Sequence, residues 1–201
     1  FGCDLWVEVT EVSETPVTPG PTTLTVIKEV VNDDGGDQAV GDFALFIDGT
    51  PVTSGTPTPV TPGAHVVSET GVSGYAATFG GACDIDGDVT VGAGEGLVCT
   101  ITNNDLPAVI TLIKVTTTTD GVAPSLDPED FEMRVDGTLV PTGSSISVSA
   151  NSSHFITEDP EPGFDLTSIT GTGCPGGTST PGTLDEGEAI TCTLTNTESG
   201  S

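Results

Sequence analysis

Apolar residues alternate with threonine or serine along most of the chain. In the stretch 190–195, three apolar residues alternate with three threonines. A period of two is typical of β-strands that turn one face toward a core. Glycine, proline and aspartate interrupt the pattern at short intervals, and no window has helical periodicity. The sequence therefore predicts an all-β protein.

The sequence also repeats itself. "LTVIK" at 24–28 returns as "ITLIK" at 110–114, and "CTITN" at 99–103 returns as "CTLTN" at 192–196. Between these motifs, "GDFALFIDGTPV" matches "EDFEMRVDGTLV", and "HVVSETGVSGY" matches "HFITEDPEPGF". Such self-similarity indicates two copies of one module.

The repeat divides the chain into three parts. The first domain is predicted at 23–105 and the second at 109–199, while residues 1–22 form an N-terminal arm and a proline-rich linker. The 201 residues suit about two small domains. The chain opens at Phe1 without a charged and apolar leader, so we expect a processed, mature product.

Four of the five cysteines occupy equivalent positions in the two copies. We predict one disulfide within each domain, Cys83 with Cys99 and Cys174 with Cys192. Closing each loop by a disulfide stabilises the folded state by about 3 kcal/mol in the chain-entropy model. The alternative is a metal site, but the spacing lacks a nearby histidine and does not fit zinc, so no metal or cofactor is expected.

The charge of the chain is extreme. Its formal net charge is −27, with Lys28, Lys114 and Arg134 as the only lysine and arginine residues. This charge disfavours binding to nucleic acid or anionic lipid, and no apolar run is long enough to span a membrane. Paired cysteines and a solvated acidic coat favour an extracellular or cell-surface location.

The strand pattern directs three kinds of polar side chain toward each core. Because side chains alternate across a strand, one lysine shares a face with Leu24 and Val26, and its repeat counterpart behaves in the same way. A glutamate and an asparagine have the same parity as core positions in each copy. The two predicted sets are Lys28, Glu69 and Asn103, and Lys114, Glu158 and Asn196.

Burial gives these sets a chemistry. A buried amine tends to lose its proton and a buried carboxylate to gain one, which are the states needed for an amine to attack an amide. We therefore hypothesise an isopeptide bond from Lys28 to Asn103 and from Lys114 to Asn196, with Glu69 and Glu158 transferring protons. The alternative is a buried Lys–Glu ion pair with the asparagine hydrogen-bonded beside it.

These residues carry a family resemblance. "LTVIK", "DF", "DGT", "SETGVSGY" and "CTITN", in this order, resemble the collagen-adhesin B-type, or SpaA-like, prealbumin-fold modules of bacterial surface proteins and pilins. The resemblance implies two tandem immunoglobulin-like or prealbumin-like β-sandwiches and the Lys–Asn bonds named above. The second copy departs from the motif, since it has "TEDPEPGF" in place of the E-T form.

The N-terminal arm has a strand pattern of its own. Leu5, Val7 and Val9 alternate with polar or aromatic residues. The arm either folds back onto the first domain or completes the sheet of a neighbouring subunit as a donated strand. Cys3 is the odd cysteine, which indicates an intermolecular bond or a free thiol.

Weaker signals remain. Asn151 begins an N-glycosylation sequon. His65 and His154 are equivalent in the repeat, either framing the glutamate sites or serving as ordinary strand residues. "NDDGGD" and "DIDGD" resemble fragments of calcium loops but lack the glutamate of an EF-hand, so acidic turns are the default.

No constellation for catalysis on an external substrate is present in the sequence. We expect an extracellular structural subunit of a pilus-like filament that binds copies of itself head to tail. The alternative is a stalk or ligand-binding module of a cell-surface adhesin.

Overall fold

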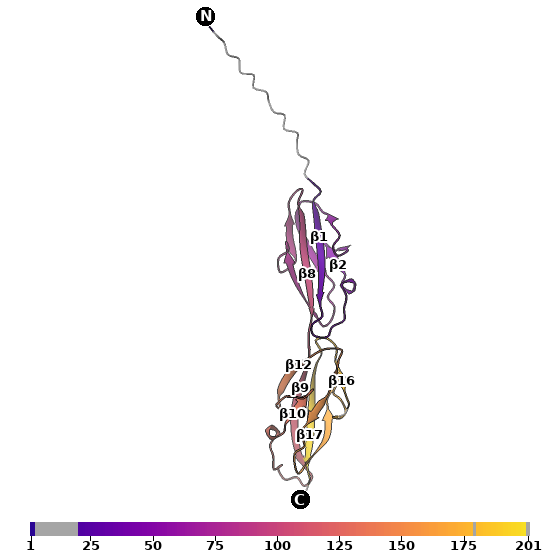
Figure 1. Cartoon of the computed structure of the whole chain (residues 1–201), viewed down its shortest axis with the longest axis vertical. Helices are drawn as coiled ribbons and strands as arrows, with labels where there is room; N and C mark the ends of the chain where they lie inside the picture. Colours follow the sequence, from indigo (N-terminus) through magenta and orange to yellow (C-terminus); the bar gives the residue numbers. More distant parts are fainter. Residues whose placement is uncertain (3–19, 179, 200–201) are drawn as a thin grey trace.

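The computed structural model describes residues 1–2, 20–178 and 180–199. In these ranges the chain forms β-strands and two short 3-10 helices, η1 (Val40–Asp42) and η2 (Pro128–Asp130). The all-β prediction is confirmed. Figure 1 shows two groups of strands arranged end to end along the long axis. The predicted arm residues Cys3, Leu5, Val7 and Val9 lie outside the described residues.

The first group, here called the first sandwich, contains two sheets of four strands. The order in one sheet is β4 (Thr58–Pro59), β1 (Thr23–Val31), β8 (Gly96–Asp105) and β6 (Tyr75–Gly81). The order in the other is β3 (Thr50–Val52), β2 (Leu45–Ile47), β5 (Gly63–Glu69) and β7 (Asp88–Val91).

The second group, the second sandwich, repeats the main sheet, but its facing strands form two smaller sheets. Its main sheet has the order β12 (Ser144–Val148), β9 (Ala108–Thr118), β17 (Ala189–Glu198) and β15 (Phe164–Thr170). The smaller sheets are β11 (Thr138–Leu139), β10 (Met133–Val135) and β14 (Ile156–Glu158), and β13 (Ser153–His154) with β16 (Gly182–Thr183). The strands of the two groups run from Thr23 to Asp105 and from Ala108 to Glu198.

The first and last strands of each sandwich are neighbours and run parallel. β1 pairs with β8 from Thr23 opposite Gly96 to Val31 opposite Asn104. β9 pairs with β17 in the same way. Parallel neighbours need a long crossover connection, and here the rest of the sandwich supplies it. Tension along the chain therefore shears the hydrogen bonds between these two strands.

The period-two pattern of the sequence accounts for both cores. In the first sandwich, Leu24 and Val26 of β1 pack with Cys99 and Ile101 of β8, and all four are at most 1% exposed. Val67 of the facing sheet is fully buried against them. The second core has the corresponding residues of β9 and β17. Burial of each such side chain stabilises the fold by roughly 1.5 to 3 kcal/mol.

Both predicted disulfides are confirmed. Cys83 is bonded to Cys99, and Cys174 to Cys192. In each pair, one cysteine belongs to the last strand and is fully buried in the core. The other cysteine lies in the loop between β6 and β7 in the first sandwich and between β15 and β16 in the second. Each disulfide therefore ties this loop directly to the hydrophobic core.

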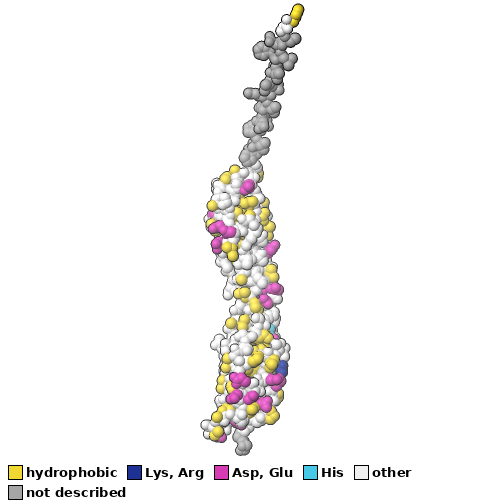
Figure 2. Space-filling model, turned by 90° about the vertical axis from the view of Figure 1, so that its left-hand side faces the viewer, with side chains coloured by type: hydrophobic (Ala, Val, Ile, Leu, Met, Phe, Trp, Pro, Cys, Tyr) yellow, Lys and Arg dark blue, Asp and Glu magenta, His cyan; other side chains and the backbone are white. Residues whose placement is uncertain are grey.

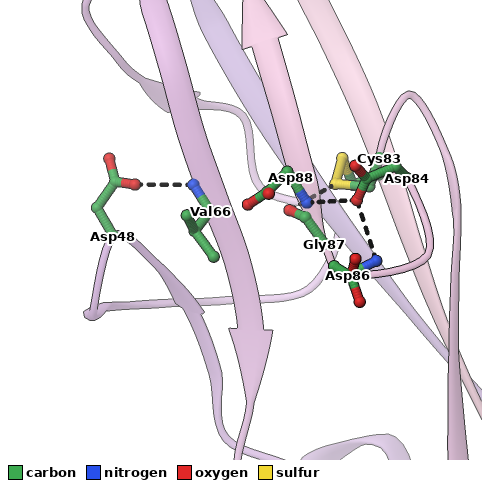
Figure 3. The surroundings of a disulfide bond; sticks show 8 residues. Asp48, Val66, Cys83, Asp84, Asp86, Gly87 and Asp88 are labelled. Carbon is green, nitrogen blue, oxygen red and sulfur yellow. Dashed lines mark hydrogen bonds between the residues drawn. A yellow bond between two sulfur atoms is a disulfide. The ribbon is translucent and has the colours of Figure 1, made fainter.

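The acidic turn "DIDGD" lies beside the first disulfide (Figure 3). The Asp84 carboxylate accepts hydrogen bonds from the backbone N–H groups of Asp86 at 3.0 Å and Asp88 at 2.9 Å. This is the local pattern by which aspartate stabilises a turn. The geometry supports the interpretation of this segment as an acidic turn.

The surface retains the acidic character of the sequence. Figure 2 shows acidic side chains over both sandwiches on the face in view. Lys28 and Lys114, in contrast, are only 4% and 3% exposed. Two of the three basic side chains of lysine or arginine type are therefore inside the protein and leave the acidic surface unneutralised.

We expect the double variant Cys83→Ala/Cys99→Ala to lower the free energy of unfolding of the first sandwich by about 3 kcal/mol through the lost loop closure. Urea unfolding without reductant measures the change. The matched variant Cys174→Ala/Cys192→Ala is expected to act on the second sandwich. An unchanged unfolding midpoint for the first sandwich contradicts the prediction.

Candidate functional site: a lysine, asparagine and glutamate in each core

The two parallel strands bring the first lysine and asparagine together. Lys28 of β1 pairs with Ile101 of β8, and Asn103 lies two residues further along β8 on the same inward face. Lys28 Nζ donates a hydrogen bond to Asn103 Oδ1 at 2.6 Å. The register of β1 and β8 places the two residues diagonally opposite each other, so the amine of Lys28 and the amide of Asn103 are in contact.

The glutamate comes from the facing sheet. Glu69 ends β5 and pairs with Leu45 of β2. Its Oε2 lies 3.4 Å from Lys28 Nζ, and the side chains of Lys28 and Glu69 are 0% and 4% exposed. Neither oxygen of the Glu69 carboxyl group makes a hydrogen bond. In the first set, Lys28 and Glu69 therefore form an ion pair across the core. The carboxyl oxygens of Glu69 can still accept hydrogen bonds.

The second sandwich has the same arrangement with a closer glutamate. Lys114 Nζ donates to Asn196 Oδ1 at 2.6 Å and also to Glu158 Oε2. Asn196 Nδ2 donates to Glu158 Oε1 at 2.5 Å. The carboxyl group therefore bridges the amine and the amide nitrogen. The structure brings all six residues singled out in the sequence together, in two sets of three.

An aromatic ring covers each lysine, a contact that the strand pattern alone does not predict. The Nζ atoms of Lys28 and Lys114 each lie 4.4 Å from a ring centroid, that of Phe43 and Phe131 respectively. The Phe43 ring packs edge-on against Tyr75. The signal was available, because "DF" occurs at the same position of both copies. The rings keep water from the amines while their faces still favour positive charge.

Burial changes the proton affinity of both lysines. Desolvation lowers the pKa of Lys28, and the nearby Glu69 carboxylate opposes this shift. Desolvation likewise lowers the pKa of Lys114, against the hydrogen bond and charge of Glu158. A lowered pKa raises the fraction of neutral amine, which is the nucleophilic form.

The two histidines contact aspartates, and their hydrogen bonds do not reach the glutamates. In His65, Nδ1 lies 2.6 Å from Asp48 Oδ2 and Nε2 lies 2.7 Å from the carbonyl oxygen of Thr61. His154 makes the equivalent contacts with Asp136 and the Ser149 carbonyl oxygen. Both ring nitrogens of each histidine face acceptors. The hydrogen bond with Asp48 raises the pKa of His65.

A buried aspartate at the end of the first sandwich was not singled out in the sequence. Asp105 is 1% exposed. Its carboxylate accepts hydrogen bonds from the backbone N–H groups of Asp33 at 3.0 Å and Gly36 at 2.6 Å. Asp34 donates to it as well. These bonds fix the loop "NDDGGD", so the loop is held by a carboxylate from the last strand.

Within the ranges that the structure describes, no helix is both long and apolar enough to cross a membrane.

Comparison with known proteins identifies the module. Residues 19–101 match the family SpaA_2, described as a prealbumin-like fold domain. The resemblance expected from the sequence is confirmed for these residues, which are similar to SpaA-like prealbumin-fold modules. No curated protein sequence matches the chain.

Solved structures of pilins match most of the chain at low sequence identity. The major pilin from Streptococcus pyogenes has 15% identity, covers 92% of this chain and 100% of its own, and has a TM-score of 0.36. The major pilin T3.2 of the same species has 12% identity, covers 89% and 98%, and has a TM-score of 0.37. T-13 has 14% identity, covers 89% and 98%, and has a TM-score of 0.33. All three TM-scores lie below 0.5, so the fold is defined by the family match and the strand order.

We expect the His65–Asp48 pair to lose its stabilising effect as the pH rises. Because the folded-state pKa of His65 is raised, the contribution is full below the unfolded-state pKa of about 6.5 and is lost as the pH passes through the folded-state pKa. Thermal unfolding of the protein and of His65→Gln, measured from about pH 5.5 to 9, tests this. His154 is common to both proteins, so equal slopes for both contradict the prediction.

Proposed function

We propose that the protein is an extracellular structural subunit of a pilus-like filament whose domains are cross-linked internally by Lys–Asn isopeptide bonds. One observation carries the proposal: in both sandwiches a buried lysine of the first strand contacts a buried asparagine of the last strand at 2.6 Å. Glu69 and Glu158 are the assisting carboxyl groups. The two bonds are Lys28–Asn103 and Lys114–Asn196.

The contacts at the second site suggest how the isopeptide bond would form. The neutral Lys114 Nζ attacks Cγ of Asn196, and a C–N bond forms while the bond from Cγ to Nδ2 breaks. Glu158 lies between the two nitrogens, with one oxygen accepting from each. It can therefore accept a proton from the attacking amine and deliver one to the leaving nitrogen, which departs as ammonia. The groups of the first site are placed for the same reaction.

The location of the bonds gives them a mechanical role. They join the strands that tension would shear apart, because the terminal strands of each sandwich are parallel neighbours. A covalent bond between residues 75 apart closes a loop worth on the order of 4 to 5 kcal/mol in the chain-entropy model. Under load, the chain between the two bonded residues carries no force and does not unfold.

Assembly is assigned to the N-terminal arm. Leu5, Val7 and Val9 have the alternation of a donated strand, and Cys3 offers a covalent link to the next subunit. A head-to-tail contact that does not close on itself produces a filament. The proposed partners are copies of this chain, at a cell surface. The family match of the first module and the rod-like arrangement in Figure 1 support this reading.

A stalk or ligand-binding module of an adhesin is the second candidate function. It shares the cross-links and differs in the arm, which would then join a preceding domain. The same end-to-end arrangement of sandwiches favours it, since a stalk also needs a stiff and extended shape.

We expect the intact mass of the reduced and denatured protein to fall short of the sum of its residues by two molecules of ammonia. Lys28→Ala, Asn103→Ala and Glu69→Ala are each expected to restore one ammonia. The corresponding variants of the second sandwich restore the other. Mass spectrometry of the intact chain, followed by detection of the branched peptides, measures this.

Arg134→Ala is the control, since Arg134 is a cation outside both sites and pairs with Glu132 and Asp159 at the surface. Its mass deficit is expected to be that of the unaltered protein. If the mass of the unaltered protein equals the sum of its residues, the cross-links are absent and each core contains a buried ion pair instead.

Deletion of residues 1–14 is expected to abolish filaments while both sandwiches stay folded. Negative-stain electron microscopy of the native protein at neutral pH, with circular dichroism of the deleted form, reads both properties. Filaments that persist after the deletion exclude strand donation by the arm. Single two-domain particles for the full chain favour the stalk.

A further inference from the structure

The two sandwiches are bound together by more than the linker between β8 and β9. Within the linker, Leu106 N–H donates to the Gly74 carbonyl oxygen at 2.8 Å, and Gly187 N–H donates to the Leu106 carbonyl oxygen at 2.9 Å. Beside it, Ala150 N–H donates to the Asp34 carbonyl oxygen at 2.7 Å. The linker is thus hydrogen-bonded to both sandwiches, and their facing loops contact each other directly.

The amide of Asn151 fastens this junction. Its Nδ2 donates to the Gly35 carbonyl oxygen of the first sandwich at 3.1 Å and to Glu186 Oε1 of the second at 3.0 Å. A side-chain amide has two N–H donors, so both are used. Asn151 adopts φ +54°, a left-handed conformation that asparagine tolerates better than most residues. The residue is therefore placed to connect the two sandwiches.

The contact leaves no room for added atoms. A Cβ atom on Gly35 would lie 2.3 Å from the Ala150 carbonyl oxygen and 2.5 Å from Ser149 Oγ. A Cβ atom on Gly74 would lie 2.4 Å from Glu186 Cβ. Even a methyl group does not fit at these two points, so the facing loops of the two sandwiches lie directly against each other.

The loop that receives Asn151 is held in place from behind. Asp105 accepts hydrogen bonds from the N–H groups of Asp33, Asp34 and Gly36, which leaves the carbonyl groups of Asp34 and Gly35 to the second sandwich. The Tyr75 hydroxyl group donates to Asn32 Oδ1 at 2.6 Å at the start of the same loop. The acceptor surface is therefore built into the first sandwich and does not depend on the second.

Asn151 is also the first residue of the sequence Asn-Ser-Ser, an N-glycosylation sequon. We propose that Asn151 is a modification site controlled by the junction: N-glycosylation and docking of the two sandwiches exclude each other. Glycosylation from a sugar nucleotide forms a bond from Nδ2 to the anomeric carbon of the sugar and releases one amide hydrogen as a proton. The bond from the anomeric carbon to the nucleoside diphosphate breaks, and the nucleoside diphosphate leaves. The sugar then occupies the space where one of the two acceptors lies.

The protein would then have two forms that differ in stiffness. With a free Asn151 amide, the two sandwiches form one stiff unit. With a sugar on Nδ2, the docking surfaces separate and the two-residue linker becomes a hinge. The inference is independent of the isopeptide bonds, which lie inside the cores.

The first test compares rates of modification. The folded protein and a synthetic peptide of residues 145–158 are each treated with a bacterial N-glycosyltransferase and UDP-glucose, and glucosylation is followed by mass spectrometry. Asn151 is exposed at the surface, but both Nδ2 hydrogens are bonded across the junction. Because these bonds must break before Nδ2 reacts, the folded protein is expected to react at least about ten-fold more slowly than the peptide. Ser153→Ala removes the sequon without touching the amide, so it reports reaction elsewhere.

A pair of glycine variants separates junction opening from general destabilisation. Gly35→Ala places a methyl group against Ala150 and is expected to raise the rate toward that of the peptide. Gly55→Ala is the matched control, because Gly55 also has positive φ, at +76°, and nothing lies within 4 Å of its Cβ position. It is expected to keep the slow rate. A folded protein that reacts as fast as the peptide overturns the proposal.

The second test measures rigidity and requires no glycosylation. Residual dipolar couplings of the unaltered protein are expected to fit one alignment tensor for both sandwiches. Asn151→Gly removes the amide and tolerates the positive φ, so it is expected to require two different tensors, as is the protein glucosylated by coexpression with the enzyme. A single tensor for the glucosylated protein or for Asn151→Gly overturns the proposal.

Discussion

The structure depends on one constraint, the parallel pairing of the first and last strands in each sandwich. This pairing places a lysine and an asparagine on one inward diagonal, and the facing sheet adds a glutamate. A lone amine buried at this depth would be costly. The amide oxygen, the carboxyl group and the aromatic ring together account for its position. Tension along the chain acts on the same pair of strands, so the lysine–asparagine contact joins the two strands that tension would separate.

The charge distribution reinforces this arrangement. A chain with a net charge of −27 has three lysine or arginine residues, and two of them are enclosed in the cores. Surface attraction therefore contributes little to holding the chain together. Disulfides, core packing and the internal lysine contacts carry that role, and a surface of one sign disfavours unspecific association between copies.

The two copies have nearly the same contacts in and around their cores, but they differ at the junction between the sandwiches. The His–Asp contacts recur with nearly the same distances, and Thr61 and Ser149 provide the same carbonyl acceptor. The following residues differ: Pro62 has no N–H group, whereas Ala150 donates across the junction. The surface that receives the first sandwich is therefore a property of the second copy alone.

The sequence by itself determined the strands, the two copies, the disulfide pairs and the inward parity of six polar residues, because a period of two and a repeat are local patterns. Only the tertiary structure decided which side chains touch. Phe43 over Lys28, Asp105 behind the loop 33–36 and Asn151 at the junction come together from segments far apart in the chain. Strand alternation states which face a residue occupies, while the packing of sheets and loops decides what lies opposite it.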